Sequence, residues 1–333
     1  MYRELSKKEA QDIKHGGFRS FIGKALEIGV RVEVHGEFGK LLKLSHGEES
    51  LYCLEGSIPV SKRLGNYTRN KELTKIILGD AGISVPRGIL AESLEEAEGK
   101  IEEHGLGFPL IVKPLDGTVA RGVTWDINSK EELEKAVGFF KEAQTQYGYK
   151  NDFLVEQMAL GDEYRVLIFD GKVVSCVKKV PASVEGDGIH TVAELIDSFN
   201  KGRLEGFGIR IDDVVRKTLD SKGLSLETVP EKGQVLKLRN NLNMSDGGRS
   251  IDCMEEMHPY FKDISERAAK LLGLTYGGLD LITADISDEH EKYVILEINP
   301  NPYYNMNEKP LVEGKGVDFS LILLKNIFPK LAL

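Results

Sequence analysis

Cysteine is scarce in this sequence. Only Cys53, Cys176 and Cys253 occur among 333 residues, and they lie too far apart for the paired spacing of a zinc site or a disulfide framework. Small secreted proteins depend on dense disulfides, whereas proteins of reducing compartments keep their thiols free. We therefore expect three ordinary reduced thiols and a cytoplasmic location.

Long hydrophobic runs and an excess of positive charge are also missing. No stretch approaches the ~20 apolar residues that a membrane-spanning helix needs, and the charged N-terminus lacks the apolar core of a signal peptide. Lys and Arg number 44 against 53 Asp and Glu, which gives a formal net charge of −9 with mixed signs along the chain. This pattern argues against a membrane partner and against nucleic acid, which binds clustered basic residues.

The length favours several subdomains. At on the order of 100 to 200 residues per domain, the chain should form two or three packed units with a cleft between them. We expect a mixed α/β fold of the α+β class in three parts, a small N-terminal unit over 1–65, a second unit over 66–155 and a third over 156–333. Residues 186–250 are rich in glycine and charge, and we interpret them as an insertion or lid.

Periodicity and turn signals place the individual elements. Apolar residues that recur at helical spacing predict helices, and short alternating runs bounded by Gly or Pro predict strands. Asp170-Gly171 between two such runs is a turn signal for a β-hairpin. We expect helices over 18–28, 70–82, 93–104, 130–147, 192–200, 212–222, 258–272 and 320–328, and strands over 30–34, 41–44, 50–54, 109–114, 122–126, 153–157, 164–169, 172–180, 277–285 and 293–298.

Three oxygen-bearing side chains late in the chain form the sharpest chemical signal. Glu297 and Asn299 are two residues apart in a strand and so point to the same face, and a neighbouring strand could bring Asp280 beside them. Such hard oxygen ligands suit Mg²⁺, which takes one or two carboxylates together with phosphate oxygens. The alternative is a set of solvated residues at a sheet edge. However, both carboxylates lie inside apolar runs, where an unpaired charge is costly to bury.

Two lysines and a glycine-rich loop could receive phosphate groups. Lys71 begins a helix and Lys113 ends the apolar strand IVKP. The loop that follows contains Gly117 and Gly122, where the backbone could approach a polyphosphate closely. The competing interpretations are a snorkelling lysine at a strand end and a simple β-turn. Each of these signals is weak on its own.

The segment EQMALGDEYRVLIF carries further polar candidates. Glu156 and Gln157 end a strand before a connection whose backbone groups could bind an adenine, and Glu163 could accept hydrogen bonds from ribose hydroxyls. Taken singly, the acids are ordinary exposed residues and Arg165 is more often structural than catalytic.

The segment LKLRNNLNMSDGGRS combines Arg239, Asn243 and Ser245 with the pair Gly247-Gly248. Adjacent glycines beside Arg239 and Arg249 could form a loop that receives a carboxylate or a transferred phosphoryl group. We count Arg239, Asn243 and Ser245 as candidate catalytic residues. A flexible surface turn is the competing interpretation.

In this order, the segments resemble the ATP-grasp superfamily over roughly residues 66–305. The likeness is closest to the ATP-grasp modules of cyanophycin synthetase and of the bifunctional glutamate–cysteine ligase/glutathione synthetase, with D-alanine–D-alanine ligase further off. It implies the ATP-grasp fold, in which two α/β subdomains clamp ATP. It rests on NKELTKIILGDAGISVP, IVKPLDGTVARGV, FLVEQMALGDEYRVLIFDGKVV, VPASVEGDGIHTVAELI, LRNNLNMSDGGRSID and LEINPNP.

The resemblance also implies a reaction and a role for each candidate. ATP phosphorylates a carboxylate, an amine attacks the acyl-phosphate, and ADP and phosphate are released; electrostatics and positioning supply most of the catalysis. By matching position, the resemblance implies that Lys71 and Lys113 bind the ATP phosphates and that Glu156 and Glu163 bind adenine and ribose. It implies that Asp280, Glu297 and Asn299 bind one or two Mg²⁺ ions, for which Mn²⁺ can substitute. It also implies that Lys179 and Arg239 stabilise the acyl-phosphate and the tetrahedral intermediate.

Substrates do not follow from the resemblance. Asp246 and Arg249 stand where cyanophycin-type enzymes have other residues, and the Mur-ligase-like domain of those enzymes has no counterpart within the 333 residues. We expect a ligase that joins amino acids or short peptides. The alternatives are a thiol, hydroxyl or carrier-protein acceptor, a phosphotransferase that stops at the phosphorylated product, and a nucleotide-binding regulatory protein. Since related enzymes are often dimers or tetramers, a homo-oligomer is a further expectation.

Overall fold

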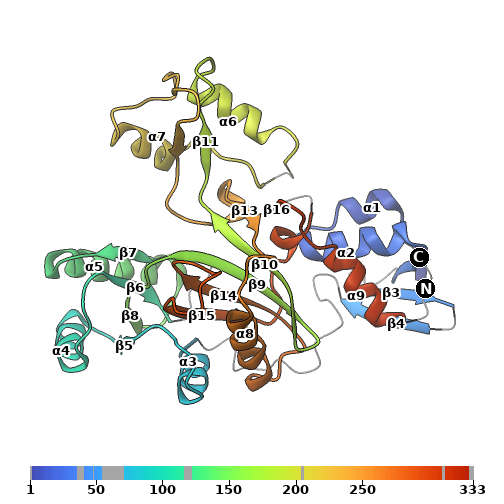
Figure 1. The fold of residues 1–333 in the computed structure, drawn as a ribbon, viewed down its shortest axis with the longest axis horizontal. Helices are drawn as coiled ribbons and strands as arrows, with labels where there is room; N and C mark the ends of the chain where they lie inside the picture. The colour runs from blue at the N-terminus through green and yellow to red at the C-terminus, as the bar shows by residue number, and fades with distance from the viewer. Residues whose placement is uncertain are drawn as a thin grey trace.

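The computed structural model describes residues 2–35, 41–47, 49–54, 71–115, 122–203, 206–309 and 312–329. Four sheets occur in these ranges, and helices pack around them, which agrees with the expected α+β class. Three units lie side by side and a fourth stands above them (Figure 1). No helix in the described ranges is both long and apolar enough to cross a membrane.

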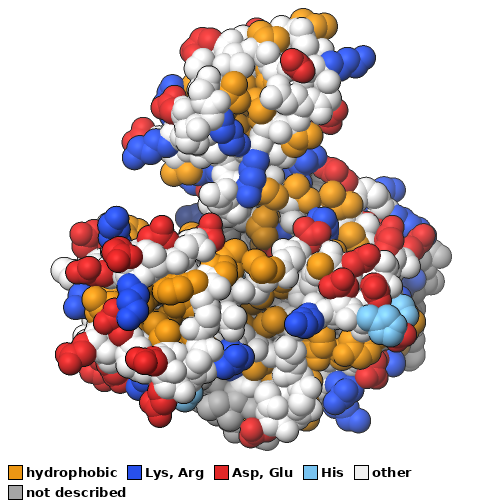
Figure 2. All heavy atoms as spheres, turned by 60° about the vertical axis from the view of Figure 1, so that its left-hand side comes forward, with side chains coloured by type: hydrophobic (Ala, Val, Ile, Leu, Met, Phe, Trp, Pro, Cys, Tyr) orange, Lys and Arg blue, Asp and Glu red, His pale blue; other side chains and the backbone are white. Residues whose placement is uncertain are grey.

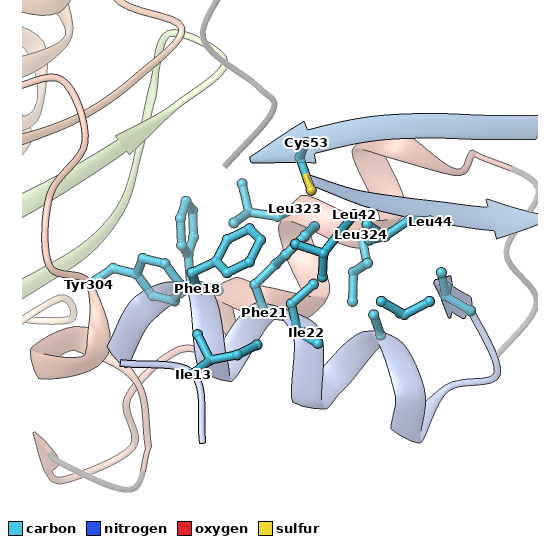
Figure 3. Packing of buried hydrophobic residues seen from close by; sticks show 14 of the residues in the cluster. Ile13, Phe18, Phe21, Ile22, Leu42, Leu44, Cys53, Tyr304, Leu323 and Leu324 are labelled. Atoms are coloured by element: carbon cyan, nitrogen blue, oxygen red, sulfur yellow. The ribbon is translucent and has the colours of Figure 1, made fainter. Parts of the chain in front are cut away.

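The N-terminal unit is an antiparallel sheet of order β1-β2-β3-β4 with helices packed on one face. Phe18 and Phe21 of α2 lie against Leu42 of β3, and the same cluster includes Tyr304 and Leu323 from the C-terminal part of the chain (Figure 3). The unit therefore shares a hydrophobic core with the rest of the molecule. Its elements are β1 Tyr2–Glu4, α1 Lys7–Gln11, α2 Gly16–Glu27, β2 Arg31–His35, β3 Leu41–His46 and β4 Glu49–Leu54, with α9 Phe319–Ile327 packed against α2.

The second unit is an antiparallel sheet of order β5-β8-β6-β7, covered by α4 and α5. Ser93 and Ser129 cap these two helices by accepting a hydrogen bond from a backbone N–H in the first turn. Phe140 of α5 packs on Phe153 of β8 with ring centroids 5.1 Å apart. The elements are β5 Gly88–Ala91, α4 Leu94–His104, β6 Leu110–Pro114, β7 Thr124–Ile127, α5 Lys130–Tyr147 and β8 Phe153–Gln157, and the helix α3 Lys71–Asp80 precedes them in the chain.

The third unit is a six-stranded sheet of order β15-β14-β9-β10-β13-β16, antiparallel except between β13 and β16. Asp170 and Gly171 join β9 to β10 with φ angles of 49° and 73°, so the predicted hairpin turn is confirmed. Helix α8 covers one face, and its Phe261 shares a core with Leu78 of α3. The elements are β9 Asp162–Phe169, β10 Lys172–Val180, β13 Arg249–Asp252, α8 Pro259–Leu271, β14 Tyr276–Thr283, β15 Tyr293–Asn299 and β16 Val312–Glu313.

An insertion after β10 forms a lobe with its own core, and Figure 2 shows this lobe standing above the body of the molecule. The core runs from Ala182 to Leu238, whereas the expected insertion covered 186–250. The boundary differs because the chain after Leu238 returns to the central sheet, where β13 pairs with β10. The elements are β11 Ser183–Glu185, α6 Val192–Asn200, α7 Asp213–Asp220 and β12 Val235–Lys237.

Candidate functional site

Two acids and an asparagine meet on one face of the central sheet. In the antiparallel pair of β14 and β15, Asp280 lies opposite Glu297 and Gly278 lies opposite Asn299. Asn299 Nδ2 donates a hydrogen bond to Glu297 Oε1 at 2.9 Å. The predicted juxtaposition of Asp280, Glu297 and Asn299 is confirmed, and their role as metal ligands stays a prediction.

Asp280 is buried between two cations. Arg165, opposite it on β9, donates from Nε to Oδ1 at 2.5 Å and from Nη2 to Oδ2 at 3.1 Å, and Lys179 Nζ lies 3.0 Å from Oδ1. Burial opposes ionisation of Asp280, which is 3% exposed, but the charges of Arg165 and Lys179 outweigh it. They lower the pKa of Asp280 to about 2, so this carboxylate is ionised at neutral pH.

Lys179 of β10 also forms an ion pair with Glu163 of β9. Burial raises the pKa of Glu163 above its ordinary value; the charge of Lys179 counteracts this rise and that of Asp280 adds to it. Lys179 therefore joins two acids that face the same side of the sheet. A phosphate bound here would compete with these carboxylates for Lys179 and Arg165.

The donor set at this face fits a magnesium ion. Asp280, Glu297 and Asn299 offer hard oxygen atoms, and Glu297 and Asn299 are only half-buried. Within the described ranges, no group of three or more His, Cys, Asp or Glu side chains is placed to hold a metal by itself. Mg²⁺ does not need such a cage, because it usually takes one or two protein carboxylates and completes its shell with water and phosphate oxygens.

A second charged cluster lies where α3, β6 and β8 meet. Glu156 is 2% exposed, Lys75 Nζ lies 2.9 Å from its Oε1, and Lys113 forms an ion pair with its Oε2. Burial opposes ionisation of Glu156, but the charges of Lys113 and Lys75 outweigh it and lower its pKa. The interpretation of Glu156 as an exposed acid is therefore wrong, since strand order places it beneath two lysines.

Sequence reasoning missed Lys75. It selected Lys71, whose side chain lies outside the described part of the structure, as does Gly117 in the loop. Lys75 follows Lys71 by four residues, so their spacing already indicated that both lie on one face of the helix. Gly122 is described, with a φ of 73°, and a Cβ there would lie 2.9 Å from the Ala143 side chain. The turn and the packing both require glycine at this position. Contact of Gly122 with a nucleotide stays a prediction.

Two backbone donors after Glu156 already have partners. The N–H of Gln157 donates to the carbonyl of Arg87 at 2.8 Å, and the N–H of Met158 donates to the carbonyl of Pro109 at 2.9 Å. A backbone N–H that binds an adenine in this connection would therefore come from a residue after Met158.

Arg239 bonds to the insertion. It is 4% exposed, and its Nη2 donates to Asp212 at 2.5 Å and to the carbonyl of Arg210 at 3.0 Å. Its Nε is buried and has no hydrogen-bond partner among the described residues. The structure thus places Arg239 at the base of the lobe. The hydrogen bonds of its Nη2 go to residues of the lobe and not to Asp280 or Glu297.

Asn243 and Ser245 lie in a short turn beside the central sheet. Asn243 precedes the 3₁₀ turn η1 Met244–Asp246, in which Ser245 is exposed. Met244 packs against Val177, which is two residues from Lys179 and on the same face of β10. The turn is therefore close to the charged face. Gly247 has a φ of 88° and a Cβ there would lie 2.3 Å from Ile209, so packing against the insertion also requires this glycine.

Part of the chain matches a known family model. Residues 68–188 match the model of the RimK-like ATP-grasp domain. Residues 68–188 are thus similar to an ATP-grasp domain. The matched range includes the second unit and the β9–β10 hairpin, and so contains Lys75, Lys113, Glu156, Glu163 and Lys179.

Relatives of the ATP-grasp domain extend the likeness over most of the chain. Cyanophycin synthetase of Crocosphaera subtropica is 37% identical over 269 residues, which are 78% of this chain and 30% of that protein. The glutathione biosynthesis bifunctional protein GshAB of Enterococcus faecalis is 33% identical over 331 residues, 93% of this chain and 42% of that protein. The chain thus spans less than half the length of either relative.

A solved structure has the same overall fold. The bifunctional glutathione synthetase of Pasteurella multocida superposes with a TM-score of 0.72 at 26% identity, over 94% of this chain and 44% of that one. The expected resemblance to the two ligase families is therefore confirmed. Because this superposition includes most of residues 1–65, the likeness extends beyond the expected range of 66–305.

Proposed function

We propose that this chain is an ATP-dependent carboxylate–amine ligase that joins amino acids or short peptides through an acyl-phosphate. The observation that carries the proposal is one face of an ATP-grasp domain on which the oxygen donors of Asp280, Glu297 and Asn299 lie beside Arg165 and Lys179. The names of the relatives, a synthetase and a glutathione biosynthesis protein, support it. Because the chain spans less than half of each relative, the proposal rests on the geometry of the site.

Both charged clusters would contribute residues to the nucleotide site. Lys113 and Lys71 would hold the phosphates, with Gly117 and Gly122 in the loop that covers them. Glu156, Gln157 and Glu163 would lie on the side of adenine and ribose. Asp280, Glu297 and Asn299 would hold Mg²⁺ as one or two ions, or Mn²⁺ in its place, and the bound ion would neutralise the phosphate charge that develops during transfer.

The proposed reaction has two steps. A carboxylate oxygen of the substrate attacks the γ-phosphorus of ATP, so that a new P–O bond forms and ADP leaves. An amine nitrogen then attacks the acyl carbon and loses a proton; the C–N bond forms and inorganic phosphate leaves. Lys179 and Arg239 would neutralise the anionic oxygens, and Asn243 and Ser245 would supply further donors to the same site.

The insertion would act as a lid over the nucleotide. It follows β10, the strand that carries Lys179, and Arg239 at its base contacts Asp212. Closure of the lobe would keep water away from the acyl-phosphate, because water would otherwise hydrolyse it. Limited proteolysis tests this proposal, since the lid should become more resistant when Mg²⁺ and ATP are added. Equal protection with and without the nucleotide would count against it.

We further propose that the enzyme works in the cytoplasm on small molecules, with no nucleic acid or membrane partner, and that it forms a homo-oligomer. The mixed surface charge and the three separated cysteines support this setting. A thiol, hydroxyl or carrier-protein acceptor, or a regulatory role in nucleotide binding, is the alternative to amide formation.

The decisive experiment is ADP release in the presence of Mg²⁺ and ATP, with amino acids and dipeptides supplied singly and in pairs. Mass spectrometry of the products identifies any condensed species. ADP that appears only with a particular pair, together with an amide product, establishes the ligase. ADP with a single carboxylate and no acceptor indicates a phosphotransferase, and nucleotide binding without turnover indicates a regulatory protein.

A further inference from the structure

Glu156 holds two lysines from two different elements at once. Lys113 belongs to β6, which neighbours Glu156 in the same sheet, whereas Lys75 belongs to α3, whose Leu78 packs in the core of the third unit. The side chains of Lys75 and Lys113 are 8% and 17% exposed, so neither ion pair is a screened surface contact. The cluster therefore joins two units next to the proposed nucleotide site.

The sheet is shaped to admit this carboxylate. Gly88 lies directly opposite Glu156 on β5, and a Cβ at Gly88 would be 2.6 Å from Glu156 Cγ and 2.8 Å from the carbonyl of Val155. Any larger residue at Gly88 would displace the Glu156 side chain. The glycine thus preserves the position from which Glu156 reaches both lysines.

Glu156 contacts one ammonium group at each of its carboxylate oxygens, Lys75 at Oε1 and Lys113 at Oε2. If Lys113 turns to a phosphate, Glu156 keeps Lys75 as its counter-ion and stays neutralised. Without Lys75, the buried carboxylate would have to retain Lys113, because an uncompensated buried charge is strongly unfavourable.

We propose that Lys75 is a positioning residue that frees Lys113 for the nucleotide phosphates by neutralising Glu156 in its place. The inference rests on the proposed nucleotide-binding function and names the charge exchange that binding requires. Lys75 itself does not touch the nucleotide. Its effect passes through Glu156 to Lys113. Lys75 therefore influences the affinity for the polyphosphate and not the affinity for the nucleoside.

The test compares the affinities of Mg²⁺–ADP and of adenosine in a set of variants, measured by calorimetry with competition for the weaker ligand. Lys75→Met should weaken Mg²⁺–ADP binding about tenfold or more, because Glu156 then retains Lys113, and should leave adenosine binding within about twofold. The control is Lys100→Met, which removes a half-exposed lysine paired with Glu96 in the same unit and should change neither affinity.

A double variant separates positioning from simple support of the fold. Lys75→Met with Glu156→Gln removes the carboxylate that retains Lys113, so it should bind Mg²⁺–ADP within about threefold of Glu156→Gln alone. If Lys75→Met does not fold, this comparison still decides the question. A further large loss of ADP affinity in the double variant would show that Lys75 contacts the phosphates directly, which overturns the proposal.

The remaining outcomes are distinct from one another. If the wild-type protein does not bind Mg²⁺–ADP, the proposed function fails. If the wild type binds and Lys75→Met binds equally well, the inference alone is wrong. Equal losses of ADP and adenosine affinity in folded Lys75→Met would indicate a purely structural residue and would also overturn it.

Discussion

Replacing Asp280 with asparagine removes one negative charge from the buried cluster of the central sheet while keeping the size of the side chain. Arg165 and Lys179 would then lack the carboxylate that both contact, and Lys179 would keep its ion pair with Glu163. Arg165 is 7% exposed, so water cannot fully replace the lost partner. The variant should therefore be less stable than the wild type.

The expected loss can be worked out in two ways. The pKa of Asp280 is about 2 against an ordinary 3.8. Because one pKa unit corresponds to about 1.4 kcal/mol, folding favours the ionised form by roughly 2 kcal/mol. Removing one partner of a buried ion pair costs about 3 to 5 kcal/mol, of which Glu163 offsets a part. We expect Asp280→Asn to lower the free energy of unfolding by about 2 to 4 kcal/mol at neutral pH.

Urea denaturation in EDTA measures this loss without a contribution from bound metal. The control is Asp170→Asn, an exposed change at a hairpin turn where asparagine also accepts a positive φ, and it should shift stability by less than about 0.5 kcal/mol. Because the pKa of Asp280 is depressed in the folded state, its contribution to stability is complete above pH 3.8 and is lost as the pH falls through about 2. A loss under about 1 kcal/mol, or one that does not shrink in that acidic window, would refute the reasoning.

Three further substitutions test other parts of the molecule. Glu297→Gln should lower turnover at least about a hundredfold, because it removes charge from a proposed metal ligand. The same substitution should change the free energy of unfolding by less than about 1 kcal/mol. Unaltered ADP release would show that Glu297 is not part of the site. Tyr304→Phe should cost about 1 to 3 kcal/mol in urea denaturation, since the buried hydroxyl donates to the carbonyl of Gly17, and an unchanged midpoint would contradict this. Burial raises the pKa of Glu308, so wild-type stability should fall as the pH rises from 4.5 through the raised value. Glu308→Gln should lack this slope, and parallel curves for the two proteins would show that another group titrates.

Local patterns in the sequence predicted most of the elements. Helix Lys130–Tyr147 and strand Phe153–Gln157 have the expected bounds, because a serine cap, a glycine stop and apolar periodicity depend on neighbouring residues alone. The same holds for the hairpin at Asp170-Gly171. Alternation along β15 also placed Glu297 and Asn299 on one face before any partner strand was known.

Some of the candidate site was predictable because motif order points to a family even where single residues do not. Lys113, Glu156 and Asp280 were selected by their places in such motifs. The sequence did not reveal that Glu156 is buried, since an acid at the end of a strand is exposed in most sheets. Nor did it reveal the apolar core of the insertion, because glycine and charged residues separate its apolar positions along the chain.

The sequence by itself determined the local elements, the turn and the side of each strand on which a residue lies, because these depend on contacts within a few residues. Only the tertiary structure decided which charges meet. Lys75 and Glu156 are 81 positions apart, and Arg165 and Asp280 are 115 positions apart. Their pairing depends on strand order and on how α3 packs between two units, and burial then makes each charge require a partner.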